Sequence, residues 1–162
     1  MRLLHRPLDR RGARCYPAPM RIFTIGYEGA TQAELVAALE AAGVERVIDV
    51  RAVPLSRKPG FSKNVLAAGL AEADIGYVHL KALGTPPEGR EAARKGRADV
   101  LERVYAAQLE TPEAAMQAAQ MIELATQSPS VLLCFERDPA MCHRTLLRKS
   151  AMPGWDAVDL AP

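Results

Sequence analysis

Short hydrophobic runs alternate with segments of helical periodicity along most of the chain. Apolar runs bounded by glycine, proline or polar residues predict five strands, at residues 21–26, 44–50, 75–80, 130–135 and 157–160. Apolar positions three and four apart predict helices between them, at residues 31–42, 62–73, 90–127 and 142–150. Strands that alternate with helices are typical of a parallel sheet. We therefore expect an α/β fold: a single domain with a mainly parallel sheet flanked by helices, in Rossmann-like layers.

Local signals place the ends of these elements. Thr31 and Glu34 form a capping-box pattern at the first helix, which Gly43 ends. The third helical segment is expected to break at Thr111 and Pro112, because proline suits the first turn of a helix. The apolar positions of the second helix are Val65, Leu66 and Leu70. In the third segment, the stripe predicted to pack on the sheet consists of Ala115, Ala118, Ala119, Ile122, Leu124 and Ala125. The proline- and glycine-rich residues 83–89 are expected to lack regular structure, and the most hydrophobic run, 130–135, to lie at the sheet centre.

Composition is that of an ordinary globular protein, with 49% hydrophobic and 25% charged residues among 162. No apolar run approaches the roughly 18 residues of a membrane span, so we expect no membrane partner. Residues 1–19 hold five arginines and three prolines against one acidic residue, Asp9. We expect them to be a disordered basic extension or an over-long start, and residues 20–162 to form the folded domain. The remaining chain has no basic excess, so broad electrostatic binding to nucleic acid is not indicated.

The three cysteines, Cys15, Cys134 and Cys142, are an odd number, and the arginine-rich start lacks the apolar core of a secretory leader. Both features argue against a disulfide framework and favour the reducing cytoplasm.

Titratable and polar residues follow the carboxyl ends of four predicted strands. Ligands bind at this edge of an open parallel sheet, so we expect these side chains to share one site. The candidates are Tyr27, Glu28, Asp49, Arg51, Arg57, His79, Glu136, Cys142, His143 and Arg144.

Two kinds of role divide these candidates. Glu28, Glu136, Cys142 and His143 are candidate catalytic residues, because carboxylates, thiols and imidazoles move protons or attack electrophiles. The others are candidate ligand-binding residues: Tyr27, Asp49, Arg51, Arg57, His79 and Arg144. Among these, the three arginines suit a clamp on phosphate or carboxylate, although Asp49 and Arg51 can instead serve structural ion pairs.

Cys142, His143 and Arg144 are expected to open the last predicted helix. A helix N-terminus favours anions and lowers the pKa of a cysteine, so Cys142 is also a candidate reactive thiol. Cys134 lies inside an apolar strand and is interpreted as a packed core residue. Cys134, Cys142 and His143 lack the paired C-x-x-C spacing of zinc modules, so a metal site is the weaker interpretation and no metal ligand is assigned.

Several of these motifs together resemble the bacterial and archaeal domain-of-unknown-function 488 family. These motifs are residues 24–29, 49–51, 56–63, 77–80 with 83–84, and 134–144. The resemblance as a whole runs from about Arg21 to Leu147. The resemblance implies an α/β fold and a shared polar site that includes the ten candidates above. Many similar proteins end with a histidine-containing strand, where this chain has Val158, Asp159 and Leu160.

Three hypotheses about function follow. The first is an enzyme, hydrolytic or base-removing, that acts on a phosphorylated or otherwise anionic ligand such as a nucleotide or a nucleic-acid end. The second is a ligand-binding or sensor domain without catalysis, and the third is thiol chemistry at Cys142. The sequence identifies no cofactor, substrate or oligomeric state.

Overall fold

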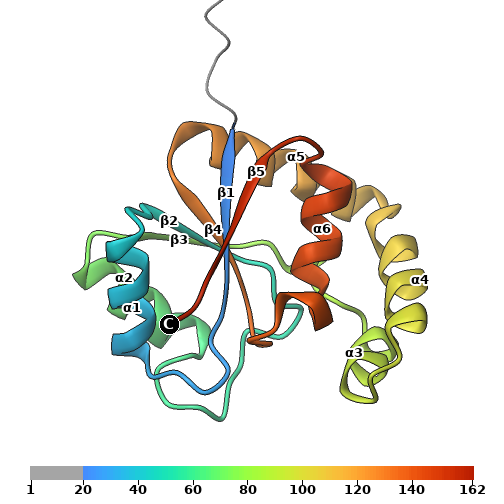
Figure 1. The fold of residues 1–162 in the computed structure, drawn as a ribbon, viewed down its shortest axis with the longest axis horizontal. Coiled ribbons are helices and arrows are strands. Elements are labelled where there is room, and N and C mark those ends of the chain that lie inside the picture. Colours follow the sequence, from blue (N-terminus) through green and yellow to red (C-terminus); the bar gives the residue numbers. More distant parts are fainter. Residues whose placement is uncertain (1–19) are drawn as a thin grey trace, which may run out of the picture.

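The computed structural model describes residues 20–162, in which one five-stranded sheet is parallel throughout (Figure 1). Its strands are β1 (Arg21–Gly26), β2 (Arg46–Asp49), β3 (Gly76–His79), β4 (Ser130–Cys134) and β5 (Asp156–Leu160), in the spatial order β3-β2-β4-β1-β5. This arrangement confirms the predicted α/β fold. The strand predicted for the centre, β4, lies there with all five residues buried. The extension expected at residues 1–19 lies outside the described residues.

Six helices flank the sheet: α1 (Gln32–Ala41), α2 (Lys63–Glu72), α3 (Pro87–Arg94), α4 (Ala98–Leu109), α5 (Pro112–Gln127) and α6 (His143–Ala151). Two 3-10 turns join them to the strands, η1 (Lys81–Leu83) and η2 (Pro139–Met141). None of the helices in residues 20–162 combines the length and the apolar character that a membrane span requires.

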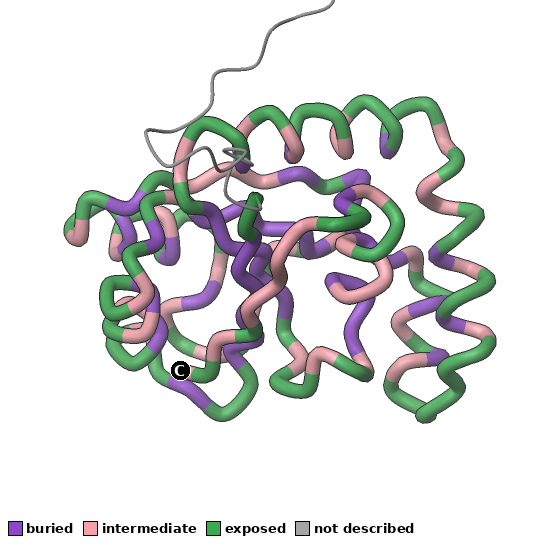
Figure 2. Tube along the Cα trace, turned by 45° about the horizontal axis from the view of Figure 1, so that its top comes forward, coloured by how far each residue is buried: buried purple, intermediate pink, exposed green. Residues whose placement is uncertain are grey.

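Two apolar cores lie on opposite faces of the sheet, because successive residues of a strand point to opposite sides. On one face, α1 and α2 bury Leu35, Leu39, Leu66 and Leu70. On the other, α4, α5 and α6 contribute Tyr105, Met121 and Leu147. Figure 2 shows the buried residues concentrated along the strands, with the outer sides of the helices exposed. The rigid sheet thus holds the loops at its carboxyl edge in fixed positions.

Helix ends follow the predicted local chemistry in most places. Thr31 accepts a bond from the backbone N–H of Glu34, whose carboxylate accepts one from the N–H of Thr31, which completes the capping box. Thr111 caps α5, and Pro112 occupies its first turn.

The long helical segment was predicted with one break but has two. Gly96 adopts φ = 66°, a left-handed conformation that ends α3 and separates it from α4. The expectation that residues 83–89 lack regular structure was also wrong in part, because α3 already begins at Pro87. Proline is well suited to that first helical position, where its missing N–H costs no bond.

The predicted packing stripe of α5 is confirmed in most of its positions. Ala125 is buried, and Ala118, Ile122 and Leu124 pack against the same core. Ala115 and Ala119 are exposed, and Ala114 and Met121 are buried without having been predicted. Alanine on neighbouring stripes of a helix gives a weak sequence signal for the edge of the packing face.

Candidate functional site

A cavity of about 700 Å³ opens at the carboxyl edge of the sheet, between the loop after β2, helix α3 and the β4–α6 segment. Six of the ten candidate residues line it: Tyr27, Glu28, Arg51, Arg57, Glu136 and His143. The other four, Asp49, His79, Cys142 and Arg144, are bonded to residues of this wall. The structure therefore gathers all ten candidates at one edge of the sheet. Six line the cavity, and the other four lie behind the lining residues and bond to them.

Arg51 forms the most extensively bonded side chain of the wall. Its Nε and Nη2 donate to the carboxylate of Asp49, with Nη2 2.6 Å from Oδ2, and its Nη1 donates to Tyr27 Oη and to the carbonyl of Phe61. Asp49 is fully buried and Arg51 is only 5% exposed. The ion pair considered from sequence is therefore present, and the guanidinium group stabilises the loop after β2.

The rings around Arg51 support the same wall. Tyr27 stacks on Phe61 with ring centroids 4.3 Å apart, and the hydroxyl of Tyr77 donates to Asp49. Burial, followed by this bond to Asp49, raises the pKa of Tyr77, so the hydroxyl remains a donor. His79 places Nε2 2.8 Å from the carbonyl oxygen of Arg51, which ties the end of β3 to this loop.

Arg144 is fully buried and holds the β4–α6 segment in place. Its Nη1 and Nη2 donate to the carbonyl oxygens of Glu136 and Arg137, and its Nε donates to Thr24 in β1. Two of these bonds satisfy backbone carbonyls of the loop, and the third joins the segment to β1. In this structure Arg144 positions the loop that carries Glu136.

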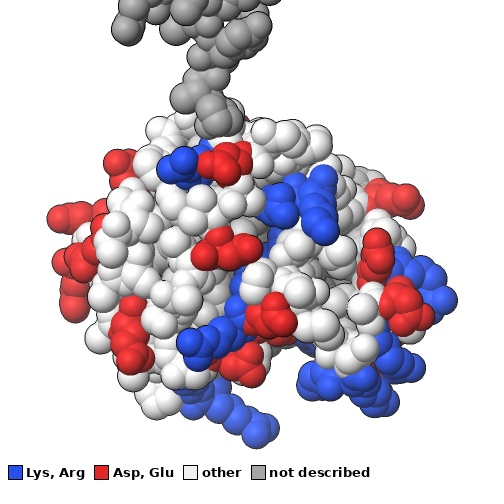
Figure 3. All heavy atoms as spheres, viewed as in Figure 1, with Lys and Arg blue, Asp and Glu red and all other residues white. Residues whose placement is uncertain are grey.

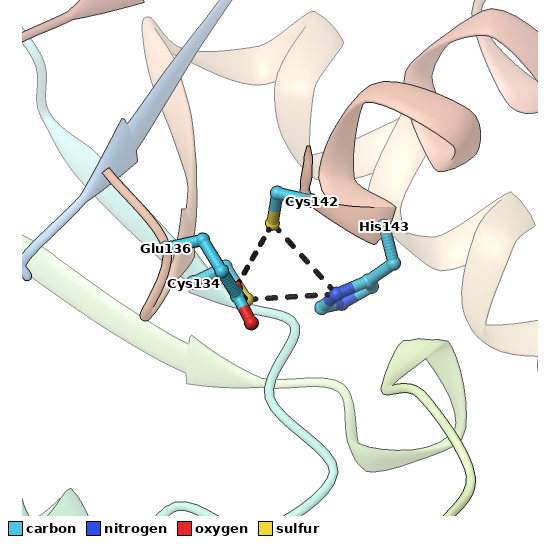
Figure 4. A group of neighbouring side chains, drawn as sticks. All are labelled: Cys134, Glu136, Cys142 and His143. Carbon is cyan, nitrogen blue, oxygen red and sulfur yellow. Dashed lines mark hydrogen bonds between the residues drawn. The ribbon is translucent and has the colours of Figure 1, made fainter. Parts of the chain in front are cut away.

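Four side chains that can bind a metal ion or carry a proton converge at the wall of the cavity. They are Cys134, Glu136, Cys142 and His143, hereafter the thiol–imidazole cluster. Their side chains point toward one another from the end of β4, the following loop and the start of α6 (Figure 4). Both thiols are within 3.3 Å of Glu136 Oε2, and they lie 3.5 Å (Cys134) and 3.9 Å (Cys142) from His143 Nδ1. Cys134 is buried, as predicted for a core residue, but its thiol faces this cluster.

His143 has a fixed orientation. Its Nε2 lies 2.9 Å from the carbonyl oxygen of Val50, and its ring packs edge-on against Tyr105. A carbonyl can only accept, so Nε2 carries the proton and, in the neutral ring, Nδ1 presents its lone pair to the thiols.

Burial and mutual charge shift the titration of the cluster. Burial, with the neighbouring Cys142, raises the pKa of Glu136. The hydrogen bond to Cys142, with burial, raises the pKa of the Cys134 thiol. Burial disfavours a thiolate at Cys142, but the bond from Cys134 and the charges of His143 and Arg144 outweigh it and lower the pKa of Cys142. Burial likewise opposes protonation of His143, and the facing Cys142 outweighs it and raises the pKa of that imidazole.

A basic rim borders the mouth of the cavity. Arg57 comes from the loop after β2, and Arg90 and Arg94 come from successive turns of α3. Among residues 20–162 none of these three guanidinium groups forms an ion pair with a carboxylate. Figure 3 shows basic side chains gathered at the lower right of the view, over α3. Arg90 donates from Nη1 to the carbonyl oxygen of Thr85 at 3.0 Å, so only its remaining donors are open to a ligand. The three rim arginines are still less engaged than Arg51, which bonds to Asp49, and Arg144, which bonds through all three of its nitrogens.

Sequence reasoning missed three residues of the site. Arg90 and Arg94 were placed in a helix without a role, and the thiol of Cys134 was assigned to the core. One signal was present for the arginines: they are four residues apart, hence on one helix face, and follow the loop after a predicted strand. No spacing motif pointed to Cys134. It approaches Cys142 only because the turn η2 brings Cys142 back toward the end of β4.

The comparisons with known proteins give one match. The family model described as Domain of unknown function DUF488 matches residues 31–151, which include the cluster and the three rim arginines. Comparison with curated proteins and with solved structures returned no match.

Proposed function

Because the chain belongs to the DUF488 family, whose description assigns no activity, we propose from its geometry that it is an enzyme for a phosphorylated or otherwise anionic small molecule. The observation that carries the proposal is the cavity itself, with unpaired cationic groups at its rim and proton-transferring groups at its base. A cavity of about 700 Å³ is in the range that holds a nucleotide-sized ligand.

The rim supplies the anion-binding half of the site. Arg57, Arg90 and Arg94 approach the cavity from two elements, and guanidinium groups bind phosphate through paired N–H donors. We assign this role to them and not to Arg51 and Arg144, whose guanidinium nitrogens all bond to protein acceptors. Arg90 gives only Nη1 to the protein, at the carbonyl of Thr85.

Exposed apolar side chains supply the part of the site that would contact an apolar or aromatic portion of the ligand. Val53, Leu55 and Phe135 line the cavity and are 48%, 75% and 45% exposed. Large exposed hydrophobic side chains beside a pocket are typical of ligand contacts, and an aromatic ring can stack on a base. An aromatic ring joined to a phosphate matches both halves, so a nucleotide or a nucleic-acid end is the ligand class we favour.

The chemistry falls to the groups at the base. Glu28, Glu136 and His143 line the cavity and can move a proton in hydrolysis or in removal of a base from its sugar. Glu28 Oε2 accepts a bond from the backbone N–H of Arg137 at 3.1 Å, which joins the loops after β1 and β4. We also propose a cytoplasmic location, since an odd number of cysteines does not suit a disulfide framework.

The test is a thermal-shift screen of inorganic phosphate, nucleotides and short single-stranded oligonucleotides, followed by chromatography of each stabilising ligand for products. We expect a nucleotide-class ligand to raise Tm, and Arg90→Ala with Arg94→Ala to remove most of that rise. Arg103→Ala, an exposed change on α4 outside the cavity, is the matched control. Glu28→Gln and Glu136→Gln should bind the ligand with little turnover. Binding without any turnover in the wild type would replace the enzyme by a sensor domain, and no binding would overturn the proposal.

A second candidate function is thiol chemistry at Cys142, which starts α6 with its sulfur 3.9 Å from His143 Nδ1. Its burial, at 2% exposed, opposes access by a substrate. Iodoacetamide labelling of a Cys15→Ser background measures this directly. Labelling of Cys142 faster than a free model thiol supports the thiol reaction, and a rate no greater excludes it.

A further inference from the structure

The thiol–imidazole cluster has the composition and arrangement of a metal centre. Two cysteine sulfurs, one histidine nitrogen and one carboxylate oxygen all lie within 4.8 Å of one another. We infer that Cys134, Cys142, His143 and Glu136 form a binding site for a divalent transition-metal ion of the zinc type.

The distances between the donor atoms fit a tetrahedral ion. With zinc–sulfur bonds of about 2.3 Å and zinc–nitrogen or zinc–oxygen bonds of about 2.0 Å, tetrahedral ligands lie roughly 3.3–3.8 Å apart. The sulfurs lie 3.0 and 3.3 Å from Glu136 Oε2 and 3.5 and 3.9 Å from His143 Nδ1. Two of these distances lie within that span and the other two lie close to its ends, so the four side chains are already gathered around one point.

The bond between His143 and Val50 is the second, independent observation. Metal-binding histidines typically donate their distal N–H to a carbonyl or carboxylate, which fixes the ring and directs the other nitrogen at the metal. His143 Nε2 makes such a bond at 2.9 Å, and Nδ1 faces the two sulfurs.

Charge balance favours a cation at the same point. Cys134 and Cys142 are 4% and 2% exposed, and Glu136 lies beside them without an ion pair to any lysine or arginine of residues 20–162. The guanidinium group of Arg144 bonds to the backbone carbonyls of the loop and not to the carboxylate of Glu136. A divalent ion would compensate the thiolates and the carboxylate, and its binding would release the thiol protons to solvent.

The donor set selects among metals. Thiolate and imidazole ligands in a tetrahedral arrangement favour zinc over the oxygen-seeking magnesium and calcium. Cys134, Glu136 and His143 also line the cavity, so Glu136 can yield its position to water or to a ligand. Three protein ligands and one exchangeable position are typical of catalytic zinc. A catalytic role for the metal rests on the proposed function. Metal binding itself is measured without substrate, so the metal site and the proposed function can each fail without the other.

The experiment is a titration of the full chain, reduced and freed of metal by a chelator, with Co²⁺ and then Zn²⁺. We expect one equivalent of Co²⁺ to give thiolate-to-cobalt charge-transfer absorption and the intense visible bands of four-coordinate cobalt, both abolished by Zn²⁺. Cys142→Ser and His143→Gln should weaken Zn²⁺ binding by at least about 100-fold. Cys15→Ser should bind as the wild type does, which controls for unspecific thiol binding.

Two results would overturn the inference. One is a cobalt spectrum identical to that of the hydrated ion, and the other is undiminished Zn²⁺ binding in Cys142→Ser. The spectrum of the unaltered protein decides the matter even if a cysteine variant does not fold. Metal binding without any nucleotide-induced stabilisation would leave the centre standing and remove only the proposed ligand.

Discussion

His143 Nε2, at the start of α6, bonds to the carbonyl oxygen of Val50, just past the end of β2, at 2.9 Å. The bond crosses from one loop of the carboxyl edge to another, and it fixes the imidazole beside both thiols. The side chain of His143 thus both anchors the start of α6 to the loop after β2 and holds one nitrogen of the cluster in place.

This relationship predicts different results for two substitutions of His143. His143→Gln can still donate to Val50 through its amide but cannot present Nδ1 to the thiols. His143→Ala leaves the buried carbonyl without a partner, which costs about 1–3 kcal/mol, in addition to the lost packing on Tyr105. Urea unfolding should therefore show a smaller loss for His143→Gln than for His143→Ala, while both lose cobalt binding. Equal stability of the two variants would contradict a stabilising role for the bond.

The buried pair Asp49–Arg51 predicts a large loss of stability when only one partner is removed. Arg51→Ala leaves the carboxylate of Asp49 buried and uncompensated, which is expected to cost about 3–5 kcal/mol in the free energy of unfolding. Arg21→Ala removes the exposed pair with Asp156 and should cost less than about 1 kcal/mol. Urea unfolding measures both, and a loss in Arg51→Ala no greater than that in Arg21→Ala would contradict this account.

The sheet was predictable from sequence because each strand has its own local signal. The five apolar runs correspond to β1–β5 within two residues at each end, and the central place of β4 follows from its uninterrupted hydrophobicity. The break at Gly96 was not predicted, because a lone glycine is tolerated inside many helices. The stripe of α5 was predicted except at its edge, where alanines on neighbouring faces give nearly equal patterns.

The site was predictable as a location more than as a set of contacts. Strand-end polarity placed Glu136 and His143 correctly at the carboxyl edge, because that rule depends only on topology. The convergence of Cys134 and Cys142 depends on a turn between residues 134 and 142, which no spacing motif encodes. Likewise, only the fold distinguishes Arg51, bonded to Asp49, from Arg90 at the cavity rim.

Gly26 is predicted to be essential for the approach of β1 to the cluster loop. A Cβ at this position would lie 1.8 Å from the carbonyl oxygen of Glu136, a backbone atom that cannot move aside cheaply. Gly26→Ala should therefore destabilise the protein by about 1–3 kcal/mol or more and displace Glu136. Gly76→Ala is the control, because a Cβ there would meet its nearest atom at an ordinary 3.6 Å. Unfolding curves and the cobalt spectrum test the pair, and an unchanged spectrum in a folded Gly26→Ala would contradict the predicted displacement.

The capping box of α1 predicts a local dependence on pH. Hydrogen bonds from the backbone N–H and then the hydroxyl of Thr31 lower the pKa of the Glu34 carboxyl below its ordinary 4.5. A group whose pKa is lower in the folded state stabilises that state above its unfolded pKa and loses the contribution as pH falls through the folded value. The contribution of Glu34 should thus be complete above about pH 4.5 and disappear on further acidification. Titration of the side-chain carboxyl by NMR should give a pKa below 4.5 in the wild type and a higher value in Thr31→Val. Thr126→Val, whose native hydroxyl bonds to the carbonyl of Glu123, should leave the titration of Glu34 unchanged. Because valine keeps the backbone N–H, a carboxyl that titrates alike in the wild type and Thr31→Val would show that the hydroxyl of Thr31 does not help to hold the ionised form.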